Sequence, residues 1–190
     1  MVRITDLKKM KTQGDKFTAL TAYDYSFAKV IEKAGIEIIL IGDSLGNVCQ
    51  GHKTTIPVSI GDMVYHTASV SRGVKETFVI ADMPFLSYGT TQNALKNSSK
   101  LMQNGAKMVK LEGGQWLSET VYQMSERGIP VCGHLGLTPQ SVHQLGGYAI
   151  QGANSKAADK IVNDAKTLEQ AGAQLLVVEC IPSSLSALIT

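Results

Sequence analysis

Residues 105–112 read GAKMVKLE, which is a glycine, a short and mainly apolar run, and then an acid. The same order recurs at 35–43 (GIEIILIGD) and 172–179 (GAQLLVVE), and the run FVIAD at 78–82 ends in an acid without a leading glycine. Each of these glycines follows apolar residues at helical spacing, where a glycine commonly ends a helix. Nearly continuous apolar runs after helices are typical of parallel strands that are buried on both faces. The repeated pattern therefore predicts parallel strands joined by helices.

The same alternation extends over the rest of the chain. Strand-like runs also lie at 17–23 and 129–133, and apolar residues at helical spacing fill the intervals, for example at 59–73. Strands that alternate with helices imply right-handed β-α-β units and a parallel sheet. No linker or low-complexity tract divides the sequence. We therefore predict a single α/β domain over residues 1–190 with about six β/α units.

Composition and charge narrow the class of protein. Hydrophobic residues make up 44% of the 190 and charged residues 18%, which is typical of a globular domain with a sizeable core. The 18 basic and 16 acidic residues give a net charge of +2, so charge favours neither nucleic-acid nor membrane binding. No apolar run approaches the roughly 18 residues of a membrane span, and residues 1–17 lack the apolar core of a secretory signal. The three cysteines have no CxxC spacing, which indicates reduced thiols and a cytoplasmic protein.

Acidic side chains follow or end several of the predicted strands. In a parallel β/α fold, residues at the carboxyl ends of strands line the ligand site, and Asp43, Asp82, Glu112, His134 and Glu179 all fall there. One such acid is as easily explained by a helix cap or a loop hydrogen bond. Four would crowd one rim, and like charges raise each other's pKa unless a cation intervenes. Mg²⁺ prefers carboxylate oxygens and keeps water sites for substrate, so we predict a magnesium site with a general base beside it.

A lysine and a histidine lie among these acids. Lys110 and Glu112 are two apart on one strand, so both side chains face the same side. A lysine in an apolar strand must be paired, and it is either half of a structural ion pair or a cation aimed at an oxyanion or substrate carboxylate. His134, in CGHLGLTPQS, is equally a loop organiser or a catalyst. The residues alone leave both alternatives open.

Other known site patterns fit less well. Ser44 lies in GDSLG, and serine esterases share this GDS, but their nucleophile needs a late Asp-x-x-His pair and the last histidine here is His143. Ser44 is therefore expected to donate a hydrogen bond to a ligand. Cys132, His134 and Cys180 have too loose a spacing for a zinc site. No G-x-G-x-x-G or P-loop pattern supports nucleotide binding.

Several segments together resemble one family. They are TAYDYSFAK, LIGDSLGNVCQGH, TTIPV, YHT, ADMPFLSY, MVKLEGG, GHLGLTPQSV, GGYAIQG and AGAQLLVVEC. Over residues 16–182 the chain resembles the ketopantoate hydroxymethyltransferase family. This resemblance implies a TIM-type (β/α)8 barrel and a cytosolic, Mg²⁺-dependent enzyme of pantothenate biosynthesis that assembles as a homodecamer. It also implies transfer of a hydroxymethyl group from 5,10-methylenetetrahydrofolate to 3-methyl-2-oxobutanoate, which gives 2-dehydropantoate.

The resemblance also implies roles for residues. The family's metal ligands align with Asp43, Asp82 and Glu112, and its ketoacid contacts align with Asp43, Ser44, Asp82 and Lys110. Its proton acceptor aligns with Glu179. Its strand-end histidine aligns with His134, which we include among the predicted substrate-binding residues. Contacts to the folate remain open between the loop at 134–155 and a neighbouring subunit.

One feature departs from the family pattern. A closed barrel needs eight strand–helix units, typically about 250 residues, and the chain ends at Thr190, just after the sixth predicted strand. We therefore expect a barrel domain over 1–190 that is incomplete at its C-terminal end. Two alternatives stay open. One is a Mg²⁺-dependent carbon–carbon lyase of the phosphoenolpyruvate-mutase and isocitrate-lyase type, although the K-K-C-G-H loop of the lyases is absent. The other is a non-catalytic fragment.

Overall fold

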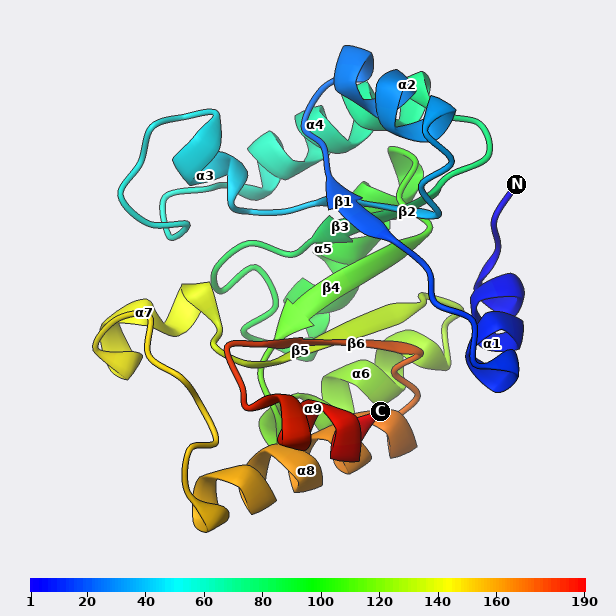
Figure 1. The fold of residues 1–190 in the computed structure, drawn as a ribbon. Helices are drawn as coiled ribbons and strands as arrows, with labels where there is room; N and C mark the ends of the chain where they lie inside the picture. The colour runs from blue at the N-terminus through cyan, green and yellow to red at the C-terminus, as the bar shows by residue number, and fades with distance from the viewer.

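A computed structural model describes all 190 residues, and its centre is one parallel sheet (Figure 1). Six strands follow one another across the sheet in chain order, and every neighbouring pair is parallel. The predicted strands are thus confirmed, with slightly different ends. Their bounds are β1 Ala19–Thr21, β2 Ile38–Ile41, β3 Phe78–Asp82, β4 Met108–Glu112, β5 Val131–Gly136 and β6 Leu175–Glu179.

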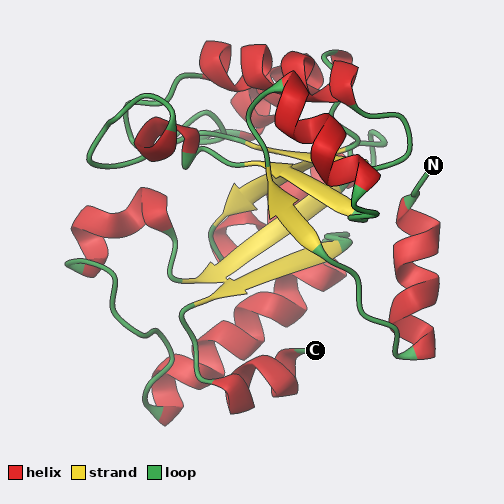
Figure 2. Ribbon diagram, turned by 45° about the horizontal axis from the view of Figure 1, so that its top comes forward, coloured by secondary structure: helices red, strands yellow, loops and turns green.

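Helices cover the outer face of the curled sheet (Figure 2). The predicted helices between strands are present, and their apolar faces pack on the strands they connect. Their bounds are α2 Tyr25–Lys33, α4 Ile60–Gly73, α5 Thr91–Gln103, α6 Ser118–Ser125 and α8 Ser155–Gln170. The remaining elements are α1 Ile4–Gln13, α3 Leu45–Val48, α7 Val142–Leu145, α9 Ser183–Ile189 and the 3-10 turns η1 Gln115–Leu117 and η2 Pro139–Ser141. No helix has the length and apolar content needed to cross a membrane.

The repeated glycines end helices, as the sequence predicts. Gly35, Gly105 and Gly172 have φ of +80°, +105° and +105°, a left-handed conformation that costs glycine little. A Cβ on Gly105 would lie 2.5 Å from the side chain of Ser71, and one on Gly172 would lie 2.5 Å from that of Ser125. These two glycines therefore also allow the chain to approach the preceding outer helix closely.

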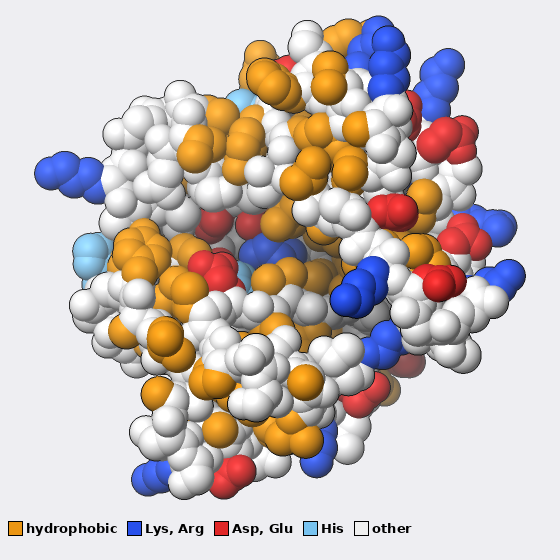
Figure 3. Space-filling model, in the orientation of Figure 1, with side chains coloured by type: hydrophobic (Ala, Val, Ile, Leu, Met, Phe, Trp, Pro, Cys, Tyr) orange, Lys and Arg blue, Asp and Glu red, His pale blue; other side chains and the backbone are white.

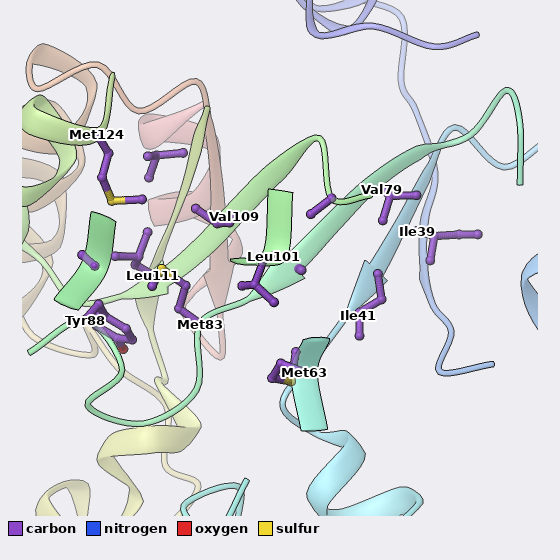
Figure 4. Close-up of a cluster of buried hydrophobic side chains, with 14 of the residues drawn as sticks. Ile39, Ile41, Met63, Val79, Met83, Tyr88, Leu101, Val109, Leu111 and Met124 are labelled. Atoms are coloured by element: carbon purple, nitrogen blue, oxygen red, sulfur yellow. The ribbon is translucent and has the colours of Figure 1, made fainter. Parts of the chain in front are cut away.

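Two apolar clusters lie on opposite faces of the sheet. The larger cluster fills the space between the strands and the outer helices, and Figure 4 shows part of it, including Ile39, Val79 and Val109. The smaller one lies on the inner face, near the start of the strands, and Leu7 of α1 packs into it. Side chains alternate between the two faces along each strand. The inner cluster consists of Leu7, Ile38, Phe78, Ile80, Met108 and Cys132.

Two parts of the chain differ from the prediction. Residues 4–13 form helix α1, which the sequence pattern did not predict. The fifth strand extends to Gly136, so His134 lies within β5 rather than at its end. Gly136 permits this extension, since a Cβ there would lie 2.2 Å from the carbonyl oxygen of Glu179 and its φ is +87°. The predicted loop at 134–155 accordingly begins later and contains η2 and α7.

Candidate active site

The predicted site residues gather where the strands end. Asp43 follows β2 by two residues, Asp82 ends β3, Lys110 lies within β4, and Glu179 ends β6. Asp82 is paired in register with Lys110, and the last residue of β4 is paired with His134. Figure 3 shows acidic, basic and histidine side chains in a hollow of the molecule. Five of the predicted residues are at most 5% exposed, namely Asp43, Asp82, Lys110, Glu112 and His134.

Lys110 is the cation at the centre of this cluster. Its Nζ lies 2.6 Å from Asp82 Oδ1, 3.8 Å from Glu112 Oε1 and 3.2 Å from His134 Nδ1. Burial opposes its charge, but the two carboxylates outweigh that effect and raise the pKa of Lys110 above its usual range. Lys110 is therefore a buried ammonium that links three neighbouring strands.

Asp43 and Asp82 form a pair of acids that the lysine neutralises only in part. The backbone N–H of Asp43 donates to Asp82 Oδ2 at 3.1 Å. Burial first, and then the charge of Asp82, raise the pKa of Asp43 to about 7. Burial also raises the pKa of Asp82, against the opposing effect of Lys110. Two carboxylates thus lie side by side, and burial disfavours the negative charge of each. Carboxylate oxygens are the ligands that hard cations prefer.

His134 lies between two carboxylates. Its Nδ1 is 3.4 Å from Glu112 Oε1, and its Nε2 is 3.3 Å from Glu179 Oε2. Burial and the charge of Lys110 lower the pKa of His134, but its close contacts with the Glu112 and Glu179 carboxylates outweigh them and its pKa is raised. A neutral ring accepts from Lys110 at Nδ1, whereas a protonated ring donates to Glu112 there. Nε2 carries a proton in both states, and it faces Glu179.

Glu112 is held by several donors. His134 and Lys110 approach Oε1, and the backbone N–H of Gln140 donates to Oε2 at 3.0 Å. Burial raises the pKa of Glu112, but the close contact with His134 and the charge of Lys110 outweigh it, so its pKa lies below the usual range. Glu112 is therefore an ionised carboxylate with both oxygens engaged.

Sequence reasoning missed Gln140 and Tyr88, which lie within this network. Gln140 Nε2 donates to Asp43 Oδ2 at 2.8 Å, and the Tyr88 hydroxyl donates to Gln140 Oε1 at 2.6 Å. Both residues are buried. They fall in the quoted segments GHLGLTPQSV and ADMPFLSY, but neither has a spacing that marks it as part of a site.

Ser44 lies at the edge of the cluster. Its Oγ is 2.8 Å from the hydroxyl of Tyr23, and no histidine or acid contacts it. The arrangement lacks the base that an esterase nucleophile requires. The three cysteines form no disulfide. All are free thiols, with Cys132 buried and Cys49 and Cys180 exposed.

The buried acidic residues meet some of the requirements of a site for a hard cation such as Mg²⁺. No group of three or more His, Cys, Asp or Glu side chains has the arrangement of a complete metal site. Mg²⁺, however, commonly uses only one or two carboxylates together with water and substrate oxygens. Asp43 and Asp82 supply two, and Asp82 Oδ1 is buried and has no hydrogen-bond partner besides its salt bridge to Lys110. These two residues fit such an ion, whereas the role of Glu112 as a ligand stays a prediction.

Comparison with known proteins identifies the relatives of this chain. The family model described as ketopantoate hydroxymethyltransferase matches residues 1–190. Two similar curated proteins are the 3-methyl-2-oxobutanoate hydroxymethyltransferases of Shewanella loihica, 58% identical over 192 residues, and Shewanella oneidensis, 58% identical over 189. Both alignments cover 100% of this chain, and they cover 73% and 72% of the relatives.

Solved structures with a similar fold belong to other enzymes. A phosphonopyruvate hydrolase in complex with oxalate and Mg²⁺ has a TM-score of 0.72 at 16% identity, over 94% of this chain and 63% of that one. A 2,3-dimethylmalate lyase of the phosphoenolpyruvate-mutase and isocitrate-lyase superfamily has a TM-score of 0.70 at 18% identity, over 100% of this chain and 68% of that one. At these identities the likeness concerns the fold alone.

Proposed function

The chain belongs to the ketopantoate hydroxymethyltransferase family, a family of enzymes, and from this we propose that it makes 2-dehydropantoate. It would transfer a hydroxymethyl group from 5,10-methylenetetrahydrofolate to 3-methyl-2-oxobutanoate, as a step of pantothenate biosynthesis. The observation that carries the proposal is the buried cluster in which Lys110 contacts Asp82, Glu112 and His134. Burying so many charges is costly, and a structural core does not require them.

The reaction begins with loss of the proton beside the ketone of the ketoacid. Negative charge then develops on the keto oxygen, and a preorganised cation stabilises such charge most effectively in a dry site. Lys110 is such a cation, because its carboxylate partners keep it protonated. Asp43 and Asp82 would hold Mg²⁺, which would supply a Lewis acid that stabilises the same developing charge.

Glu179 is the proposed proton acceptor. Its side chain is 42% exposed, so it can face a substrate, and the Nε2 of His134 lies 3.3 Å from its Oε2. The histidine would orient the carboxylate and balance its charge. The deprotonated carbon then bonds to the methylene carbon of 5,10-methylenetetrahydrofolate, water supplies the hydroxyl group of the product, and tetrahydrofolate leaves. Ser44 would donate a hydrogen bond to the bound ketoacid from the end of β2.

The family supports further proposals about architecture and setting. We propose that the single domain over 1–190 forms six β/α units of a TIM-type (β/α)8 barrel, and that the protein acts in the cytoplasm as a homodecamer. The curled parallel sheet and the greater length of the relatives support the barrel, whereas the cytoplasm and the homodecamer rest on the family resemblance alone. The lyase alternative rests only on a likeness of fold at 18% identity. The buried ion pairs of Lys110 favour an enzyme over a non-catalytic fragment.

Exchange of the substrate proton tests this function. In D₂O with Mg²⁺ and 3-methyl-2-oxobutanoate, the wild-type protein should exchange the C3 proton, followed by NMR, and should form 2-dehydropantoate once the folate is added. Glu179→Gln should slow exchange by about 10²–10⁴-fold, the usual contribution of a positioned base, while ketoacid binding is retained. The matched control is Glu169→Gln, on the exposed surface of α8.

The outcomes separate two failures. If Glu179→Gln exchanges as fast as the wild type, Glu179 is not the base. If the wild-type protein gives neither exchange nor product, the proposed function itself is wrong.

A further inference from the structure

A buried glutamine connects two of the acids from a distant part of the chain. Gln140 lies in η2, after β5, and only 5% of it is exposed. Its side chain reaches Asp43, 97 residues earlier, and its backbone N–H reaches Glu112. No other residue outside the predicted set contacts both acids through hydrogen bonds.

All hydrogen-bonding groups of the Gln140 side chain are used. Nε2 donates to Asp43 Oδ2 at 2.8 Å and to the carbonyl oxygen of Met83 at 3.0 Å, while Oε1 accepts from the Tyr88 hydroxyl at 2.6 Å. The orientation of the amide follows from this chemistry. A flipped amide would place its oxygen against two acceptors, so only one orientation satisfies the three partners.

Asp43 particularly needs such a partner. It lies two residues beyond β2, so the hydrogen bonds between strands do not hold its backbone in place. Gln140 engages Oδ2 and leaves Oδ1 for another ligand. A hydrogen bond that fixes one oxygen of a carboxylate in this way is a common feature of the residues around metal ligands.

We infer that Gln140 is a positioning residue that orients the Asp43 carboxylate, and with it Glu112, for the divalent cation of the reaction. This inference rests on the proposed function. Tyr88 supports Gln140 by fixing its amide. Gln140 does not contact the reacting atoms, so it acts through Asp43.

Metal binding tests this role independently of turnover. Mn²⁺ serves as the probe in the presence of 3-methyl-2-oxobutanoate, and both its dissociation constant and its EPR spectrum are measured. Gln140→Leu should weaken Mn²⁺ binding by about 10–100-fold, which is typical when a partner of a metal ligand is lost. Tyr88→Phe should weaken it less, since Gln140 keeps its bond to Asp43 and only the hydroxyl that bonds the amide and the backbone of Glu112 is removed. The matched control, Gln144→Leu, changes an exposed glutamine of α7 and should leave the affinity unchanged.

Each result decides between positioning and packing. Weaker Mn²⁺ binding with an altered EPR spectrum in Gln140→Leu, but not in Gln144→Leu, supports the inference. Wild-type affinity in Gln140→Leu, or an equal loss in the control, overturns it. If Gln140→Leu does not fold, Tyr88→Phe decides, and wild-type affinity in that variant overturns the inference. Failure of the wild-type protein itself to bind Mn²⁺ would overturn the metal of the proposed function, and the inference with it.

Discussion

The inner face of the sheet has two halves that are built from the same strands but differ in chemistry. Near the start of the strands it carries Ile80 and Met108, and near their ends it carries Asp82 and Lys110. Burial does not distinguish the halves, because Met108 is 0% and Lys110 is 4% exposed. The fold therefore supplies one kind of surface, and the inward-facing residues at the ends of the strands decide whether it stabilises the protein or forms a site.

The two halves are held together by different forces. The apolar half is stabilised by area removed from water, about 25 cal/mol per Å², and any side chain of suitable shape contributes. The charged half pays a desolvation penalty that only well-matched partners offset. A substitution in the first half should therefore act mainly on stability. One in the second should act on stability and function together, and it should depend on pH.

Removing the central cation should have the largest effect. Lys110→Met keeps most of the side-chain volume but leaves Asp82 buried without a counter-charge and Glu112 with His134 alone. Breaking one partner out of a buried ion pair typically costs about 3–5 kcal/mol of the free energy of unfolding. We expect such a loss in urea unfolding at pH 8, together with loss of proton exchange in the ketoacid.

Lys166→Met provides the matched control, because Lys166 is exposed on α8. We expect that variant to unfold at nearly the same urea concentration as the wild type. If Lys110→Met matches the control, the charged half is not held together by pairing, and the comparison between the halves fails.

A cavity in the apolar half should affect stability alone. Met108→Ala removes a fully buried side chain from the inner cluster, and large-to-small changes of this kind cost about 2–5 kcal/mol. The folded fraction should still exchange the ketoacid proton at the wild-type rate. Differential scanning calorimetry and NMR exchange on the same sample measure both quantities. Met10→Ala, at a partly buried position of α1 that packs on the same cluster, should cost less. Slower exchange in Met108→Ala would show that the halves are coupled.

The sequence predicted the charged half better than the connections that support it. A glycine, an apolar run and an acid form a pattern that can be recognised within a few residues. The positions of Asp82 and Glu112 at the ends of strands could therefore be predicted from the sequence. Helix α1 does not connect two strands. Its apolar residues pack on the inner face of the sheet, and that face exists only once the strands have come together. Leu7 is buried for that reason. Local pattern therefore did not predict it.

Gln140 and Tyr88 escaped prediction for a related reason. A buried polar side chain is informative only once its partners are known, and Gln140 meets Asp43 across 97 residues of sequence. The spacing of residues along the sequence does not indicate such a contact. The extension of β5 to Gly136 likewise depends on a close approach to Glu179, which the sequence of β5 alone does not reveal.

The smallest effect concerns the pH dependence of the charged half. Burial and the charge of Asp82 raise the pKa of Asp43 to about 7, whereas a free aspartate titrates near 3.9. Between these values the native state binds a proton that the unfolded chain has released. This contribution to the stability of the metal-free protein is therefore lost progressively as pH rises from about 4 to about 7.

Asp43→Asn should remove this dependence, because the amide imitates the protonated acid and its oxygen can still accept from Gln140. In a chelator, the variant should be more stable than the wild type at pH 8. That advantage should shrink by roughly 2–3 kcal/mol by pH 5, where the native carboxyl is already protonated. Calorimetry from pH 5 to pH 8 measures the change, and the variant should also lose Mn²⁺ binding. A constant difference in stability across this range would mean that Asp43 ionises normally. In that case, repulsion between the Asp43 and Asp82 carboxylates would not explain why a cation binds in the charged half.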